Sequence, residues 1–205
     1  MPVPRLAHAA TLVLLATAAG CVPLLLTGWV ADPGQGTPVH SACTLDNSVP
    51  DAVSVPVQGL RALVSLRQSG SRAFVEVRFD VPPGLTLMLD DDLIEVRTAA
   101  AGAARQVRFP NVSLVDGPIV NSYSTSSAIA PYQVPVRTPL VGGRTVIQGA
   151  AWDRHCWIAA LVAEQPVPDE LWITLPGFTV NATPARIPAL HYRQRRLLVA
   201  APLNC

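Results

Sequence analysis

Prolines and glycines divide this chain into short segments. Its 205 residues include 20 prolines and 13 glycines, and beyond the N-terminal apolar run no window keeps a 3.6-residue hydrophobic period for three turns. Short runs of alternating apolar and polar residues occur instead, bounded by Pro and Gly. About nine such runs predict an all-β chain with an antiparallel, β-sandwich-like fold.

The clearest alternation predicts a hairpin. Residues 60–67 alternate apolar and polar side chains, with Leu63 as the exception, and residues 75–79 alternate again after the turn sequence Gln68–Ser71. Two such runs joined by a short polar stretch with glycine are typical of an antiparallel hairpin. Residues 157–163 form a longer apolar run that is expected to be either a strand or a helix. Further short strands are predicted at residues 85–89, 93–96, 107–109, 112–115, 144–149, 171–175, 178–180, 187–192 and 197–199.

An uncharged apolar run near the N-terminus predicts export. No charged residue occurs from Ala9 to Val30, while Arg5 precedes this run and Asp32 is the first charge after it. A short basic start before an apolar run orients the N-terminus to the cytoplasm and the rest of the chain outside. We therefore expect the domain to lie on the periplasmic side of a membrane in the cell envelope.

This run divides the chain into three parts. Residues 1–30 are expected to be a signal peptide, lipoprotein leader or membrane anchor. Residues 31–49 contain several Pro and Gly residues and are expected to be a tether. Residues 50–205 are expected to form the β-sandwich-like domain, which is a typical length for one domain.

Three interpretations of the leader remain open. The sequence Ala18-Ala19-Gly20-Cys21 resembles a bacterial lipobox, and this resemblance implies that Cys21 becomes the lipidated N-terminus. Alternatively, Ala16-Thr17-Ala18 has the small-x-small pattern of ordinary signal cleavage, which would give a secreted protein. In the third interpretation, residues 9–30 span the bilayer uncleaved as a helix.

Charge and composition exclude some functions. All 15 basic residues are arginine and there is no lysine, which excludes lysine Schiff-base and phosphate-loop chemistry. Beyond residue 30 the chain carries 14 arginines and 14 acidic residues. Because nucleic-acid binding needs an excess of positive charge, we expect no nucleic-acid partner.

Three cysteines follow the leader. Cys43 opens the expected domain and Cys205 is the last residue. Exported thiols meet an oxidising compartment, and domain termini often lie close together, so a Cys43–Cys205 disulfide is predicted. Cys156 lies in an apolar run, where a buried thiol behaves as a small hydrophobe. A Cys156–Cys205 bridge and three unpaired thiols are the alternatives.

The sequence contains no recognisable catalytic motif. Asp153 and His155 are two apart, so on a strand they would share a face and could orient a general base. The pair lacks a nucleophile and a third metal ligand, and we expect it to be a surface or interface pair. Asp90, Asp91 and Asp92 lack the spacing of a calcium loop and are expected to form a solvated hairpin turn. We therefore predict no catalytic residue, no metal and no cofactor.

Aromatic residues are weak candidates for binding. Residues 116–141 form a long interval rich in Ser, Thr and Pro, and loops of this length are either functional or mobile. Tyr123 and Tyr132 in this interval are candidate contact residues. Trp152 is a third candidate, because with Trp157 it could form a sugar platform. The two tryptophans have opposite strand parity, so at least one is expected in the core.

These observations favour a protein without enzymatic activity. We expect an envelope protein, lipidated or otherwise held at a membrane, whose β domain supports structure or contacts another envelope protein. A carbohydrate-binding module and a hydrolase without a recognisable motif are the alternatives. The hydrolase would need Asp153 and His155 to converge with another polar group, and the carbohydrate module would need exposed, coplanar aromatic rings.

Overall fold

The computed structural model describes residues 21–39, 52–109, 111–116, 136–139, 145–149, 154–164 and 166–202. These residues form antiparallel β-strands, as predicted, and contain no helix. No helix within these ranges is long and apolar enough to cross a membrane.

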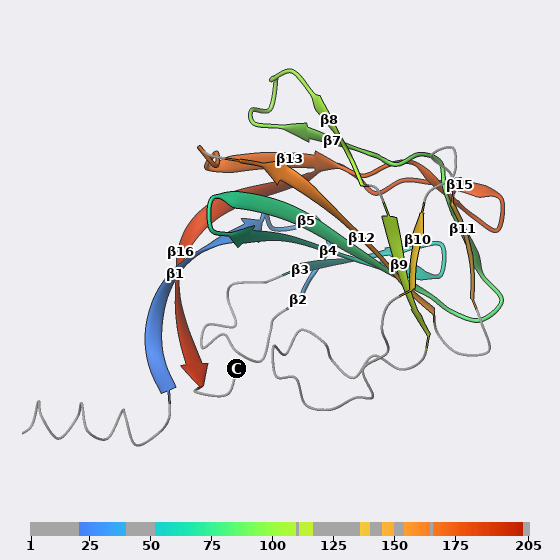
Figure 1. Cartoon of the computed structure of the whole chain (residues 1–205), viewed down its shortest axis with the longest axis horizontal. Coiled ribbons are helices and arrows are strands. Elements are labelled where there is room, and N and C mark those ends of the chain that lie inside the picture. Colours follow the sequence, from blue (N-terminus) through green and yellow to red (C-terminus); the bar gives the residue numbers. More distant parts are fainter. Residues whose placement is uncertain are drawn as a thin grey trace, which may run out of the picture.

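The strands form three sheets (Figure 1). The five-stranded sheet has the order β1 (Cys21–Ala31), β16 (Leu190–Pro202), β13 (Glu170–Thr174), β7 (Leu93–Arg97) and β8 (Arg105–Arg108). The seven-stranded sheet has the order β10 (Val136–Pro139), β9 (Asn111–Asp116), β12 (Arg154–Ala163), β5 (Arg72–Val81), β4 (Leu60–Ser69), β3 (Ala52–Val57) and β2 (Thr37–Val39). The four-stranded sheet has the order β11 (Thr145–Gln148), β6 (Thr86–Leu89), β14 (Phe178–Val180) and β15 (Thr183–Ala185).

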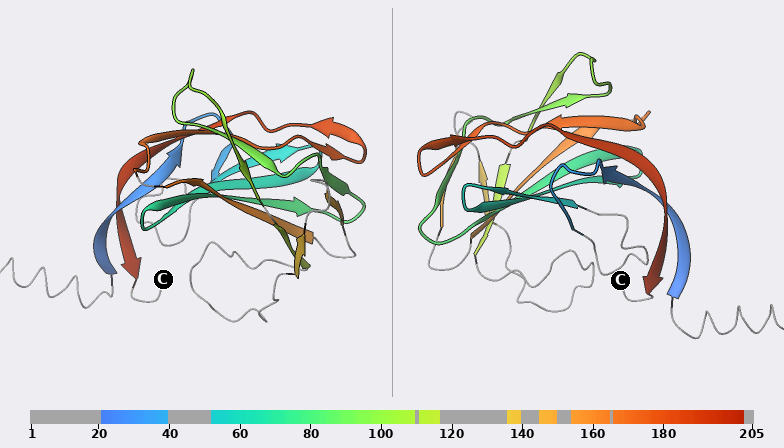
Figure 2. Two further views of the ribbon diagram at one scale, coloured as in Figure 1. Left: turned by 45° about the horizontal axis from the view of Figure 1, so that its top comes forward. Right: turned by 180° about the vertical axis from the view of Figure 1, so that it is seen from behind.

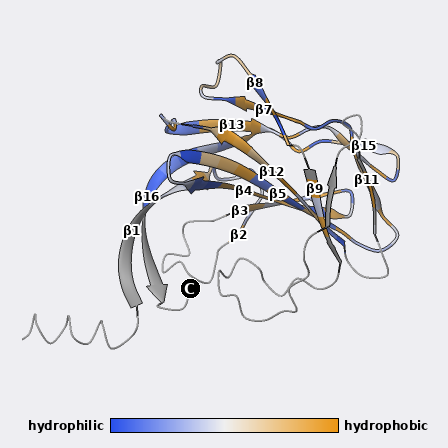
Figure 3. Ribbon diagram, in the orientation of Figure 1, coloured by the Kyte–Doolittle hydropathy of each residue, from blue (hydrophilic) through white to orange (hydrophobic). Residues whose placement is uncertain are grey.

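The five-stranded and seven-stranded sheets face each other and enclose the core. Hydrophobic and hydrophilic residues alternate in bands along their strands (Figure 3), because successive residues of a strand point to opposite faces. The hydroxyl of Tyr192 on β16 donates a 3.0 Å hydrogen bond to the carbonyl of Val64 on β4 and so joins the two sheets. Phe79 of β5 packs edge-to-face against Phe178 of β14, with ring centroids 5.5 Å apart, and joins the four-stranded sheet to the same core.

The predicted hairpin is present. Strands β4 and β5 pair from Arg61–Asp80 to Ser69–Arg72 in one register, around the turn at Gly70. The ambiguous run at residues 157–163 belongs to a strand, β12, which lies between β5 and β9. Buried and less buried residues alternate along most of β12, which explains why the helical alternative is wrong.

The chain from Cys21 to Val39 belongs to the sheets. Strand β1 contains the second half of the apolar run from Ala9 to Val30, and its Trp29 and Ala31 are buried in the core. Strand β2 lies within the expected tether and pairs with β3. Gly36 is packed so closely that a Cβ atom there would lie 2.5 Å from Cγ1 of Val53.

The three consecutive aspartates do not form a hairpin turn. They connect β6 to β7, which belong to different sheets. Asp92 is buried and its carboxylate lies 2.5 Å from a guanidinium nitrogen of Arg108, while Asp91 accepts a 2.8 Å hydrogen bond from the amide of Leu93. The expectation of a solvated turn is therefore wrong, because two of these carboxylates have protein partners that fix the crossover between sheets.

Strands β1 and β16 extend beyond the sandwich as a two-stranded ribbon. Strand β13 pairs with β16 only from Leu190 to Arg193, whereas β1 pairs with β16 along its whole length, from Cys21–Pro202 to Ala31–Tyr192. The ribbon curves away from the rest of the molecule in all three views (Figures 1 and 2). Its far half consists of residues 21–26 paired with residues 197–202.

Candidate functional site

His155 and Asp80 form the most buried polar pair of the structure's described part. The residues face each other across the β5–β12 pair, and Nδ1 of His155 lies 2.7 Å from Oδ1 of Asp80. Both are largely buried, at 5% and 9% relative exposure. The sequence predicts that His155 and Asp153 form a surface or interface pair. A surface position for His155 is wrong, because its side chain is buried against Asp80, 75 positions earlier in the chain. Asp153 lies outside the described residues.

Two arginines complete the surroundings of Asp80. A guanidinium nitrogen of Arg61, on β4, lies 2.6 Å from Oδ2, and Nε of Arg78, on β5, lies 2.9 Å from Oδ1. Burial alone would raise the pKa of Asp80, but the hydrogen bond with His155 and the charges of Arg78 and Arg61 outweigh it and lower this pKa below its ordinary value. The carboxylate is therefore ionised at neutral pH and can only accept hydrogen bonds, so Nδ1 of His155 is the donor.

Strand geometry separates His155 from the neighbouring thiol. Cys156 is fully buried in the core, on the opposite face of β12. Burial raises the pKa of its thiol strongly, so the reactive thiolate is scarce. The Asp80–His155 pair has the orienting part of a catalytic triad, but Cys156 does not supply its nucleophile. The arrangement ties β4, β5 and β12 together through charge-assisted hydrogen bonds.

Trp157 lies on the same outer face as His155. The guanidinium carbon of Arg78 is 6.0 Å from the centre of the Trp157 ring, and the imidazole of His155 is 5.9 Å from it. The ring therefore packs against the charged network rather than in the core. The prediction that Trp152 or Trp157 occupies the core is untested for Trp152, which lies outside the described residues.

A second histidine cluster lies on the outer face of the five-stranded sheet. Nδ1 of His191 lies 2.6 Å from Oδ2 of Asp32, and Nε2 lies 3.4 Å from Oε2 of Glu170. Nε of Arg193 lies 3.4 Å from both carboxylates. The imidazole of His191 stacks on the indole of Trp172, with an interplanar angle of 6° and centroids 4.0 Å apart.

This cluster anchors the chain that follows β1. Asp32 directly follows β1, and its amide donates a 3.0 Å hydrogen bond to the carbonyl of His191. The side-chain oxygen of Gln35 accepts a 2.9 Å hydrogen bond from the amide of His191. The contacts hold the start of the ribbon against β13 and β16. Within the described ranges, no group of three or more His, Cys, Asp and Glu residues is arranged to hold a metal ion.

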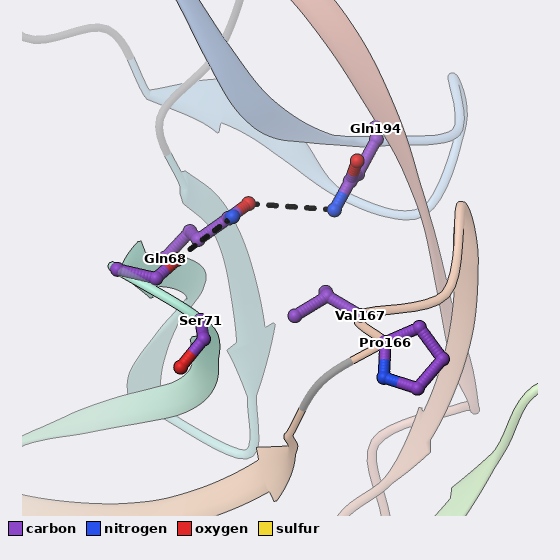
Figure 4. A pocket seen from close by; sticks show the side chains of 6 residues that line it. Gln68, Ser71, Pro166, Val167 and Gln194 are labelled. Carbon is purple, nitrogen blue, oxygen red and sulfur yellow. Dashed lines mark hydrogen bonds between the residues drawn. The ribbon is translucent and has the colours of Figure 1, made fainter.

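The open hollow shown in Figure 4 is polar and shallow. Gln68 and Ser71 line it from the β4–β5 hairpin, Pro166 and Val167 line it from the segment after β12, and Gln194 lines it from β16. The side chains of Gln68 and Gln194 are joined by a 3.3 Å hydrogen bond. None of the described residues that line this hollow has an ionisable side chain, so they offer no group for acid–base chemistry.

Of the sequence-predicted site residues, only Cys21 belongs to the described strands. The backbone of Cys21 begins β1. Cys43, Cys205, Tyr123, Tyr132 and Trp152 lie outside the described residues.

Sequence reasoning missed Asp80, Asp32, Glu170 and Trp172. All four lie in strands or at strand ends, and their partners come from strands that are distant in sequence. A single sequence does not show which distant strands lie side by side. Comparisons with protein-family models, with curated proteins and with solved structures find no match to this chain.

Proposed function

We propose that this chain is a lipid-anchored protein of the cell envelope whose β domain lies outside the cytoplasm. One observation carries the proposal: Cys21, the cysteine of the lipobox-like sequence, is the first residue of strand β1. Cleavage directly before Cys21 would leave every described strand intact. The acyl chains would then be attached at the far end of the ribbon formed by β1 and β16.

The strand assignment of residues 21–31 counts against the uncleaved helix. Those residues pair with β16 along their whole length, and Trp29 is only 4% exposed. The same residues cannot also form the second half of a membrane-spanning helix over residues 9–30. Ordinary cleavage after Ala18 is compatible with strand β1, and it is the main rival to lipidation.

We also propose that the domain works through contact or structural support rather than catalysis. Among the described residues, the buried carboxylates have basic partners, as Asp80 does in Arg61, Arg78 and His155. Catalytic sites instead keep a perturbed group facing a cleft that can admit a substrate. Another envelope protein is the partner class that fits a domain held at a membrane.

Metabolic labelling with radioactive palmitate tests the anchor. The full-length chain should incorporate label and sediment with membranes, whereas Cys21→Ser should incorporate none and lose the processed form. Cys156→Ser is the matched control, because it changes a buried cysteine outside the lipobox and should leave labelling intact. Unlabelled wild-type protein that is processed after Ala18 and released from membranes would refute the proposal.

A further inference from the structure

We propose that the far half of the β1–β16 ribbon is a membrane-contacting element that lies in the interfacial region of an anionic bilayer. This inference rests on the proposed lipid anchor and adds a second, non-covalent attachment. It concerns residues 21–26 and 197–202, which pair with each other in one antiparallel register and extend beyond the sheet. Among the described strands, no third strand pairs with this half of the ribbon.

The composition of this element is apolar on both strands. The paired sequences are Cys-Val-Pro-Leu-Leu-Leu and Leu-Leu-Val-Ala-Ala-Pro, in which Leu25 is opposite Leu198 and Leu24 is opposite Val199. Successive register positions belong to opposite faces of a strand, so both faces of this ribbon carry apolar residue types. An antiparallel strand commonly has one polar face, whereas residues 21–26 and 197–202 include no charged residue.

Two arginines mark the boundary of the apolar half. Arg195 and Arg196 are exposed and lie opposite Gly28 and Thr27. As adjacent residues of β16 they occupy opposite faces, so each face of the ribbon has one positive charge where its apolar part begins. No acidic residue occurs in β1 or in β16.

This charge pattern selects an anionic lipid surface over a second copy of the chain. Phospholipid headgroups supply negative charge at the depth where apolar residues meet the acyl region, and each nearby arginine strengthens such binding. A second ribbon would supply no carboxylate to Arg195 or Arg196. The lipid-bearing Cys21 would lie at the far end of the same element, so the covalent anchor and the apolar residues would reach the bilayer together.

The open edges of the ribbon limit its depth. Unpaired backbone N–H and C=O groups are costly in hydrocarbon, so an open sheet edge does not cross the bilayer core. Pro23 and Pro202 carry no N–H donor, which lowers this cost near the far end. We therefore place the ribbon among the headgroups and the upper acyl chains, where water and lipid oxygens satisfy the remaining backbone groups.

Photo-crosslinking in membranes tests this placement. A benzophenone amino acid replaces Leu25 or Leu198 in the full chain, and membranes containing radiolabelled phosphatidylglycerol are irradiated. Val146 is the matched control, because it is an apolar residue with 59% exposure on β11 of another sheet. We expect phospholipid adducts at Leu25 and Leu198 and none above background at Val146.

A charge variant tests the arginines separately. Arg195→Glu combined with Arg196→Glu should reduce the phospholipid adduct at Leu198 by about fivefold per arginine, and high salt should reduce the wild-type adduct in the same direction. Arg186→Glu, an exposed arginine in the segment before β16, should leave the yield unchanged. Circular dichroism checks that each variant keeps its β signal. If Leu25 or Leu198 does not tolerate the benzophenone amino acid, the probe is placed at Leu24 or Val199 instead.

The outcomes separate this inference from the proposed anchor. Adducts to a second copy of the chain would indicate that the ribbon forms a dimer contact instead of contacting the bilayer. Adducts to another protein would indicate that the ribbon binds a protein. Either result overturns the inference, as does a chain that is lipidated and sediments with membranes but yields no phospholipid adduct. A chain that neither incorporates palmitate nor sediments with membranes overturns the proposed anchor and this inference together.

Discussion

Oδ1 of Asp80 accepts a 2.7 Å hydrogen bond from Nδ1 of His155, across two strands whose residues lie opposite each other in register. Arg61 and Arg78 approach the same carboxylate. This carboxylate is largely removed from water and bound by three side chains, so we expect its replacement to lower the free energy of unfolding. We therefore expect the stability of the domain to be especially sensitive to the loss of the charge on Asp80.

Replacement of Asp80 by asparagine should destabilise the domain strongly. Removing one partner of a buried ion pair leaves the other charges uncompensated and costs about 3 kcal/mol. Urea unfolding followed by circular dichroism measures the change in unfolding free energy. Glu164→Gln is the matched control: Glu164 pairs with Arg72 at 3.5 Å, both side chains are more than half exposed, and we expect a loss below about 0.5 kcal/mol. An equal loss for both variants would contradict the assigned role of Asp80.

The lowered pKa of Asp80 also predicts an acid-sensitive contribution to stability. The pKa of Asp80 in the folded chain is below its ordinary value of 3.8. As the pH falls, the carboxylate of the unfolded chain therefore takes up its proton first. The contribution of Asp80 is complete well above pH 3.8 and decreases as the pH drops below that value towards the folded pKa. Asp80→Asn should show a flatter decline of unfolding free energy between about pH 5 and pH 2 than the wild type. Parallel slopes for the two proteins would refute this assignment.

The alternation of apolar and polar residues predicted much of the fold. The β4–β5 hairpin follows directly from it, because apolar residues at every second position need a buried face. The alternation did not indicate strand β1, for a physical reason. Its residues are apolar on both faces, which is the composition of an export segment, and only the pairing with β16 shows that the strand belongs to a sheet. Leu63 broke the alternation because it is buried on the outer face of β4, at 2% exposure.

The polar clusters were less predictable than the strands. His155 was a candidate, but its neighbour in sequence, Asp153, was the only carboxylate that strand periodicity could propose. Asp80 is 75 positions away, and its proximity depends on the order of β5 and β12 in the sheet. His191 likewise meets Asp32, 159 positions earlier, through the pairing of β1 with β16. Strand order is a property of the whole chain, so residue spacing along one strand does not reveal these contacts.

Tyr192 gives a prediction about the contact between the two large sheets. Its ring is 1% exposed, and its hydroxyl bonds the carbonyl of Val64 in the facing sheet. Tyr192→Phe keeps the packing and removes the donor, so we expect a loss of about 1 kcal/mol. Tyr192→Leu also removes ring volume and should cost more, about 2–4 kcal/mol. Equilibrium unfolding measures both values. A phenylalanine variant as stable as the wild type would mean that the hydrogen bond between the sheets adds nothing.

The final prediction concerns the three cysteines that follow Cys21. Cys156 forms no disulfide within the described part of the chain and is 0% exposed, and burial raises the pKa of its thiol. A buried thiol with a raised pKa is a poor nucleophile in disulfide exchange, which favours the Cys43–Cys205 bridge over the Cys156–Cys205 alternative. With Cys21 lipidated, Cys43 and Cys205 are the remaining pair.

Peptide mapping without reductant should find Cys43 joined to Cys205. Alkylation before and after denaturation should modify Cys156 only in the unfolded protein. The bridge would close a loop of more than 100 residues, and the chain-entropy estimate for such a loop is roughly 4–5 kcal/mol. Cys43→Ser should lower the urea midpoint accordingly, while Cys156→Ala, the matched control, should leave the bridge intact. Free Cys43 and Cys205 thiols in protein isolated from the envelope would refute the pairing, and modification of Cys156 in the folded protein would refute its burial.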